Sequence, residues 1–123
     1  MADNMQKLFT SLFIFGAMLN ASFCNAAVDP DSLAKCLTAK GWIMYGAAGC
    51  SACATQKSYF GSAMGSVRTI NCDEYASRAQ IEQCIANRIN YTPTWLLVVN
   101  GQERDRLEGY QSLDELAAAS GCG

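Results

Sequence analysis

The chain contains no histidine among its 123 residues. This absence excludes a histidine-based catalytic triad and any metal site with histidine ligands. Charged residues are few, at 16% of the chain, and they sum to a net charge of −2. Because nucleic-acid binding depends on a basic surface, no nucleic-acid partner is expected. There are no repeats, low-complexity stretches or internal linkers, and the length suffices for one domain.

The chain also lacks a hydrophobic run that could span a bilayer comfortably, which takes about 20 residues. An apolar-biased stretch runs only from Leu8 to Leu19; Lys7 precedes it, and small residues follow it through Ala27. This pattern is typical of a secretory signal peptide. We therefore expect residues 1–27 to be a cleaved signal peptide and residues 28–123 to act in the periplasm or after secretion. An uncleaved anchor and a buried core helix are the alternatives.

Cysteine, by contrast, is abundant: there are seven, and Cys24 lies in the expected signal peptide. A lipid anchor on Cys24 is disfavoured because the bulky Phe23 precedes it. Cleavage leaves an even number of cysteines, which suits an oxidising compartment. Six cysteines allow fifteen pairings, so the residues alone leave the connectivity open. The six are Cys36, Cys50, Cys53, Cys72, Cys84 and Cys122.

Helix and strand signals alternate along the chain in the order α-β-α-β-α-β-β-α. Three of the predicted helices have a recognisable start, which is either an Asp cap followed by proline or a Ser that is followed three residues later by Gln or Glu. The remaining helix should begin near Cys50 and stop at Gly61. The three starts are Asp29-Pro30, Ser77 with Gln80, and Ser112 with Glu115.

The last two of the four predicted strands should form a hairpin, because Asn100-Gly101 between them is a strong hairpin signal. The final strand is the more polar of the two and should lie at an edge of the sheet. After Ser77, helical spacing places four residues on one apolar face, namely Ile81, Cys84, Ile85 and Ile89. The predicted strands are 42–45, 67–72, 94–99 and 102–108.

The motif that carries chemistry is Cys50-Ser51-Ala52-Cys53. Alone, C-x-x-C indicates a redox site, a zinc site or a plain disulfide. Here it falls at an expected helix start, where free N–H groups and the helix dipole stabilise a thiolate. In such motifs the pKa of the first cysteine falls to roughly 3.5–7, against about 8.5 for a free thiol. We expect Cys50 to be the catalytic nucleophile and Cys53 to resolve the mixed disulfide; an inert disulfide is the alternative.

Zinc binding is a competing use of four of the cysteines. Their spacing is C-x2-C, then eighteen residues, then C-x11-C, which lacks the second tight knuckle of a zinc ribbon. Export to an oxidising compartment also disfavours a zinc–thiolate site. No metal site is therefore expected.

A second motif, Tyr91-Thr92-Pro93-Thr94, lies downstream of the C-x-x-C. The order of elements, with C-x-x-C after the first strand and a proline before the hairpin, resembles the thioredoxin fold. That α/β fold has a central mixed sheet flanked by helices, here with an extra N-terminal helix. The resemblance implies that Thr92 and a cis Pro93 face the C-x-x-C and shape the substrate groove. A proline that merely opens an edge strand is the alternative.

More narrowly, the chain is similar to the thioredoxin-like domain found with bacterial vitamin K epoxide reductase homologues. In that family the domain passes disulfides between exported cysteine-containing proteins and a membrane quinone reductase. The resemblance implies a redox-active disulfide with no other cofactor, and a membrane redox partner of the vitamin K epoxide reductase type. The matching stretches are Tyr45-Gly46-Ala47, the C-x-x-C, Gln56-Lys57, Phe60-Gly61, Cys72, Cys84, Tyr91 to Trp95, and Gly121-Cys122.

Four positions depart from the pattern of these families. Gly49 stands where tryptophan is usual, and Ser51-Ala52 stands where Pro-His is usual. Met44 occupies the position at which thioredoxins carry a buried acid. The reduction potential and the direction of the reaction are therefore left open.

The same resemblance implies that Cys72 pairs with Cys84, a pair that ordinary thioredoxins lack. This disulfide would be structural, contributing about 3 kcal/mol in the loop-entropy model, or it would relay electrons from the C-x-x-C pair. Cys36 and Cys122 then remain. A bond between them would join the first helix to the C-terminus and contribute about 4 to 5 kcal/mol in the same model.

The sequence thus predicts an extracytoplasmic thiol–disulfide oxidoreductase that oxidises exported proteins. A reductase or isomerase in the same compartment is one alternative, and a non-catalytic binding module with three disulfides is another. The reduction potential of the C-x-x-C pair separates them: a value near thioredoxin's roughly −270 mV favours a reductase, and one near −120 mV a strong oxidant.

Overall fold

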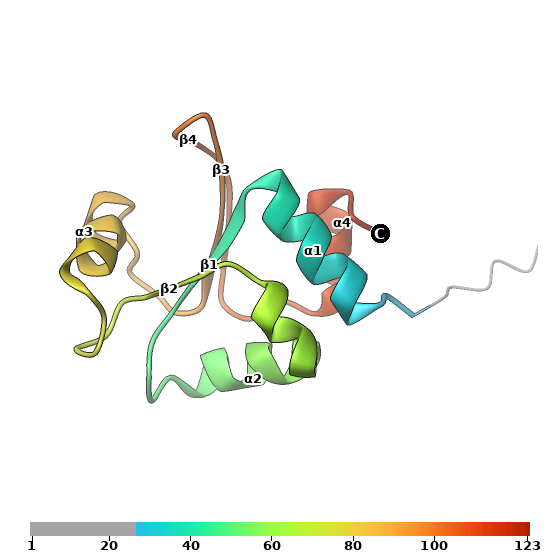
Figure 1. The fold of residues 1–123 in the computed structure, drawn as a ribbon, viewed down its shortest axis with the longest axis horizontal. Helices are drawn as coiled ribbons and strands as arrows, with labels where there is room; N and C mark the ends of the chain where they lie inside the picture. The colour runs from blue at the N-terminus through green and yellow to red at the C-terminus, as the bar shows by residue number, and fades with distance from the viewer. Residues whose placement is uncertain (1–26) are drawn as a thin grey trace, which may run out of the picture.

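A computed structural model describes residues 27–123 of the chain. The predicted signal peptide lies outside these residues, apart from Ala27, and stays a prediction. The elements follow the predicted order, with one additional 3-10 helix (Figure 1). They are α1 (Pro30–Lys40), β1 (Trp42–Gly46), α2 (Ser51–Phe60), η1 (Gly61–Ser66), β2 (Thr69–Asn71), α3 (Arg78–Ala86), β3 (Thr94–Val99), β4 (Gln102–Glu108) and α4 (Leu113–Ser120).

The four strands form one mixed sheet in the order β2-β1-β3-β4. β1 runs parallel to β2 and antiparallel to β3, and β4 completes an antiparallel hairpin with β3. Asn100 and Gly101 both have positive φ, at 53° and 73°, as a type I′ turn requires. The polar strand β4 lies at the edge, which confirms that part of the sequence prediction.

Helices cover both faces of the sheet. α3 lies on one side, and α1, α2 and α4 lie on the other (Figure 1). The two faces correspond to two apolar clusters, a larger one that includes Leu33, Trp42 and Trp95, and a smaller one around Tyr45 and Cys84. Among the helices of residues 27–123, none is both long enough and apolar enough to cross a membrane.

The extra N-terminal helix α1 is tied to the C-terminal end of the chain. Cys36 on α1 forms a disulfide with Cys122, which follows α4. Lys40 Nζ also donates to the carbonyl oxygen of Ser120 at 2.6 Å. α1 therefore belongs to the domain as a packed layer, and the two ends of the domain are held side by side.

The helix starts predicted from sequence are all found. Asp29 caps α1, and its side chain accepts from the N–H of Ser32. Ser77 and Ser112 open α3 and α4, each with a complete capping box. Cys50 is the N-cap of α2, so the predicted placement of the C-x-x-C at a helix start is also confirmed.

Two predicted extents are wrong. The second strand covers only Thr69–Asn71 instead of 67–72, because the 3-10 helix η1 occupies the chain just before it. Helix α3 ends at Ala86 and does not continue to Ile89, since Arg88 has a positive φ of 53° and turns the chain back. Ile89 then packs on the smaller cluster, whereas Ile85, predicted to be on the apolar face, is 72% exposed.

Candidate active site

The C-x-x-C motif lies where the chain leaves the sheet and enters α2. β1 ends at Gly46, residues 47–49 form a short loop in which Ala48 and Gly49 are exposed, and Cys50 is the N-cap of the helix. Gly49 has a φ of +72°, a conformation that favours glycine. Cys50 and Cys53 are joined in a disulfide, one helical turn apart. The turn into the helix therefore explains why glycine stands at position 49.

Two hydrogen-bond donors point at the sulfur of Cys50. The backbone N–H of Cys53 lies 3.1 Å from Cys50 Sγ, and the hydroxyl of Thr92 lies 3.3 Å from it. Both would face the negative charge of a thiolate after reduction, and the N-terminus of α2 adds the positive end of its dipole. The site can therefore stabilise a Cys50 thiolate without any charged side chain in the motif.

The two sulfurs differ in their access to solvent. Cys50 is partly exposed, whereas Cys53 is only 1% exposed and packs in the larger apolar cluster. Met44, at the position of the thioredoxin acid, is fully buried in the same cluster. An incoming sulfur can therefore reach Cys50 but not Cys53, which matches the order of attack predicted from the sequence. The catalytic roles themselves stay predictions.

The second motif lies against the first, as the resemblance implied. The Thr92–Pro93 peptide bond is cis, and β3 begins immediately after it at Thr94. The carbonyl oxygen of Thr92 lies 3.3 Å from Cys50 Sγ. An open pocket of about 390 Å³ adjoins this point and is lined by Tyr91, Thr92, Glu108 and Gly109. The structure thus brings Cys50, Thr92 and Pro93 together beside a surface that an extended chain could occupy.

Gln56 is an important residue that the sequence reasoning noted only as part of a matching stretch. Its side chain is fully buried on α2. Oε1 accepts from the indole N–H of Trp95 at 2.9 Å and from the N–H of Gln111 at 2.7 Å, and Nε2 donates to the carbonyl oxygen of Gln111 at 3.0 Å. Gln56 therefore fixes the active-site helix to β3 and to the segment before α4. The sequence signal for this role was a glutamine on the inner face of the predicted helix, where an apolar residue is usual.

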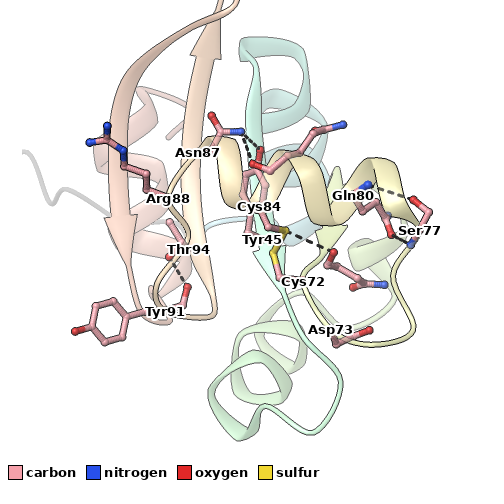
Figure 2. The surroundings of a disulfide bond; sticks show 12 residues. Tyr45, Cys72, Asp73, Ser77, Gln80, Cys84, Asn87, Arg88, Tyr91 and Thr94 are labelled. Carbon is pink, nitrogen blue, oxygen red and sulfur yellow. Dashed lines mark hydrogen bonds between the residues drawn. A yellow bond between two sulfur atoms is a disulfide. The ribbon is translucent and has the colours of Figure 1, made fainter.

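The other four cysteines form the two disulfides that were expected. Cys36 pairs with Cys122, and Cys72 pairs with Cys84. Figure 2 shows the second of these, which joins the end of the β2 segment to α3. A cleft of about 490 Å³ next to it is lined by both sulfur-bearing residues and by Ile81, Ile85, Arg88, Ile89 and Asn90. Whether this bond is structural or a relay stays a prediction.

The zinc interpretation requires several ligand side chains that lie close enough to share an ion. Within residues 27–123, no three histidine, cysteine, aspartate or glutamate side chains are placed to hold one together. All six cysteines in this range are engaged in disulfides. The competing zinc interpretation therefore gains no support from the geometry.

Comparison with known proteins supports the fold. No family model matches the chain. A solved thioredoxin from Aeropyrum pernix is similar over 75% of this chain and 82% of its own length, with a TM-score of 0.51 and 13% sequence identity. Thioredoxins from Malassezia sympodialis and Nicotiana alata, at 23% and 22% identity, each give a TM-score of 0.49; the former match covers 69% of this chain and 79% of that one, the latter 65% and 70%. The match to the Aeropyrum pernix structure and the mixed sheet flanked by helices show that the chain has a thioredoxin-like fold.

Proposed function

We propose that the protein is a thiol–disulfide oxidoreductase that exchanges disulfides with exported cysteine-containing proteins. One observation carries the proposal. The partly exposed Cys50 caps α2, and its sulfur accepts hydrogen bonds from the Cys53 N–H and the Thr92 hydroxyl. These donors would stabilise the thiolate that every exchange step must form or release.

The proposed reaction oxidises a substrate dithiol. A substrate thiolate attacks Cys50 Sγ, a new S–S bond forms, and the Cys50–Cys53 bond breaks, with Cys53 leaving and taking up a proton. The second substrate thiolate then attacks the substrate sulfur of this mixed disulfide and releases Cys50 as a thiolate. The substrate loses two electrons, which Cys50 and Cys53 gain. The groove beside Thr92 and Pro93 would hold the substrate backbone during both steps.

The favoured direction is oxidation of the substrate. Because the two donors at Cys50 stabilise the thiolate, they favour the dithiol form of the protein over its disulfide, which raises the oxidising power of the pair. Reoxidation would come from a membrane redox partner of the vitamin K epoxide reductase type. This partner rests on the sequence resemblance described above and belongs to the proposal.

An oxidising compartment fits the cysteine usage of the domain. All six cysteines of residues 27–123 lie in disulfides, and disulfides persist in the periplasm and outside the cell. Together with the predicted signal peptide, this arrangement supports action in the periplasm or after secretion. No cofactor beyond the redox-active disulfide is included in the proposal.

The test is the reduction potential of the Cys50–Cys53 pair, measured by equilibration in glutathione buffers, thiol trapping and mass mapping. A potential above about −230 mV supports an oxidant or isomerase, one near −270 mV indicates a reductase, and a pair still oxidised below about −300 mV indicates a structural bond. In parallel, Cys50→Ser should abolish exchange with a peptide dithiol. Full activity of Cys50→Ser would refute the assignment of the nucleophile.

A further inference from the structure

The loop that precedes Cys50 is held from outside by two adjacent residues, Cys72 and Asp73. The N–H of Cys72 donates to the carbonyl oxygen of Gly46 at 2.8 Å, where β1 ends. The N–H of Ala48 donates to Asp73 Oδ2 at 2.6 Å. The end of β1 and the middle of the short connection to the N-cap of α2 are therefore bonded to the same two-residue segment.

That segment is itself firmly placed. The other carboxylate oxygen of Asp73, Oδ1, accepts from the N–H of Tyr75 at 2.8 Å, and its backbone oxygen accepts from the N–H of Ala76 at 3.0 Å. Cys72 is bonded to Cys84, which is only 6% exposed and packs in the smaller apolar cluster. Figure 2 shows Asp73 following Cys72 in the turn that leads into α3. The Cys72–Cys84 disulfide anchors Cys72 to the buried Cys84, and it thereby also restrains the neighbouring Asp73.

Residues 47–49 depend on the hydrogen bond to Asp73 because little else restrains them. Ala48 and Gly49 are exposed, and Gly49 has no side chain to restrict its backbone. Across the part of the chain that the structure describes, Asp73 makes the only side-chain hydrogen bond to residues 47–49. The sulfur of Cys50, immediately after them, must stay within reach of its two donors. A change in the loop would therefore alter how well those donors stabilise the thiolate.

We propose that Asp73 is a positioning residue for Cys50, and that the Cys72–Cys84 disulfide controls the reactivity of Cys50 through Asp73. This role differs from a purely structural bond, because the disulfide acts on the reactivity of Cys50, and from an electron relay, because it requires no electron transfer between the two disulfides. The inference deepens the proposed function and rests on it for its biological meaning. Opening the second disulfide would leave Cys50 and Cys53 chemically intact but less well arranged.

The test measures Cys50 itself in the reduced pair. Cys50–Cys53 is opened with two glutathione thiols, which yield the dithiol and one glutathione disulfide, and the rate of Cys50 alkylation by iodoacetamide is followed against pH with mass mapping. Asp73→Ala should lower the rate near pH 6 by about three- to tenfold, the effect of one ordinary hydrogen bond, and move the pH midpoint upward. Asp73→Asn keeps an acceptor oxygen and should recover most of the rate.

Glu74→Ala is the matched control, because it removes the same charge from the next residue of the same turn and Glu74 has no hydrogen-bond role in the loop. Its midpoint should equal that of the wild-type protein. Cys72→Ser with Cys84→Ser should shift the profile in the same direction as Asp73→Ala. Combining these changes with Asp73→Ala should add little further, because both act on one support, and such non-additivity is the signature of coupled residues.

Equal profiles for Asp73→Ala and Glu74→Ala would overturn the proposal, and so would strictly additive effects of Asp73→Ala and the loss of the second disulfide. If Asp73→Ala fails to fold by circular dichroism, the Asp73→Asn protein and the double serine variant decide the matter. The alkylation profile is independent of substrate turnover. A wild-type protein that is reduced by glutathione but exchanges no disulfides with peptide dithiols would refute the proposed function and still allow the comparison of profiles.

Discussion

Replacing Thr92 by valine tests the chemistry at Cys50 most directly. Valine keeps the branched shape of threonine but lacks the hydroxyl that lies 3.3 Å from Cys50 Sγ. A hydrogen bond to a charged group contributes about 1.5–3 kcal/mol. Because Thr92 is only partly buried and the Cys53 N–H donor remains, we expect a loss at the low end of this energy range. About 1.4 kcal/mol corresponds to one pH unit, so the midpoint of Cys50 alkylation should rise by about one unit.

The assay is iodoacetamide alkylation of the reduced protein across pH, read at Cys50 by mass mapping. The same loss should shift the glutathione equilibrium toward the Cys50–Cys53 disulfide by about tenfold. Thr94→Val is the control, since it removes the same atom two residues away. The Thr94 hydroxyl donates to the carbonyl oxygen of Tyr91 at 2.7 Å and has no bond to Cys50.

The reasoning predicts that Thr94→Val lowers stability without moving the alkylation midpoint. If Thr92→Val leaves the midpoint where it is in the wild-type protein, the hydroxyl has no part in holding the thiolate. The stabilisation would then belong to the Cys53 N–H and the helix terminus alone.

Three further predictions concern stability. Gln56→Leu should lower the free energy of unfolding in urea by about 2–4 kcal/mol, because the buried groups that it now satisfies lose their partner. Serine at Cys36 and Cys122, which are 86 residues apart, should lower it by about 4–5 kcal/mol. Burial raises the pKa of Tyr45 above its usual 10.0. The folded protein therefore keeps that proton to higher pH than the unfolded chain does, so stability should fall as pH rises past about 10, and less steeply in Tyr45→Phe.

Each of these three stability predictions has its own control. Loss of the shorter Cys72–Cys84 loop, spanning 12 residues, should cost only about 3 kcal/mol, and an equal or larger loss would contradict the loop-length argument. Lys57→Leu, at an exposed position of the same helix, is the control for Gln56→Leu. Equal stabilities of these two variants would show that the buried amide does not hold α2. Parallel curves for wild type and Tyr45→Phe above pH 10 would contradict the pKa argument.

Local signals in the sequence were sufficient for most of the fold. Capping boxes, the proline after Asp29 and the Asn100-Gly101 turn each act over a few residues, so their effect can be read without knowing the rest of the chain. The placement of Cys50 at a helix start followed from the same kind of signal. The resemblance then supplied the cis proline and the pairing of Cys72 with Cys84.

What was missed depends on tertiary contacts. Helical spacing placed Ile85 on an apolar face, but only Cys84 of α3 is buried, because the helix is short and Arg88 turns the chain away. The 3-10 helix η1, Gly-Ser-Ala-Met-Gly-Ser, has no periodic apolar pattern to reveal it. Asp73 contacts a backbone N–H 25 residues earlier, and no local pattern encodes such a pairing.

The Cys36–Cys122 bond has a mechanical consequence. A pulling force applied between residues 27 and 123 would pass from α1 to the C-terminal end directly through this disulfide, because it joins residues 86 positions apart. The sheet and the C-x-x-C site would carry almost none of that load. About 300 Å of chain, at roughly 3.5 Å per residue, would stay inextensible until the bond is reduced. Threading the oxidised domain through a narrow pore would therefore require reduction before unfolding could release the chain between the two cysteines.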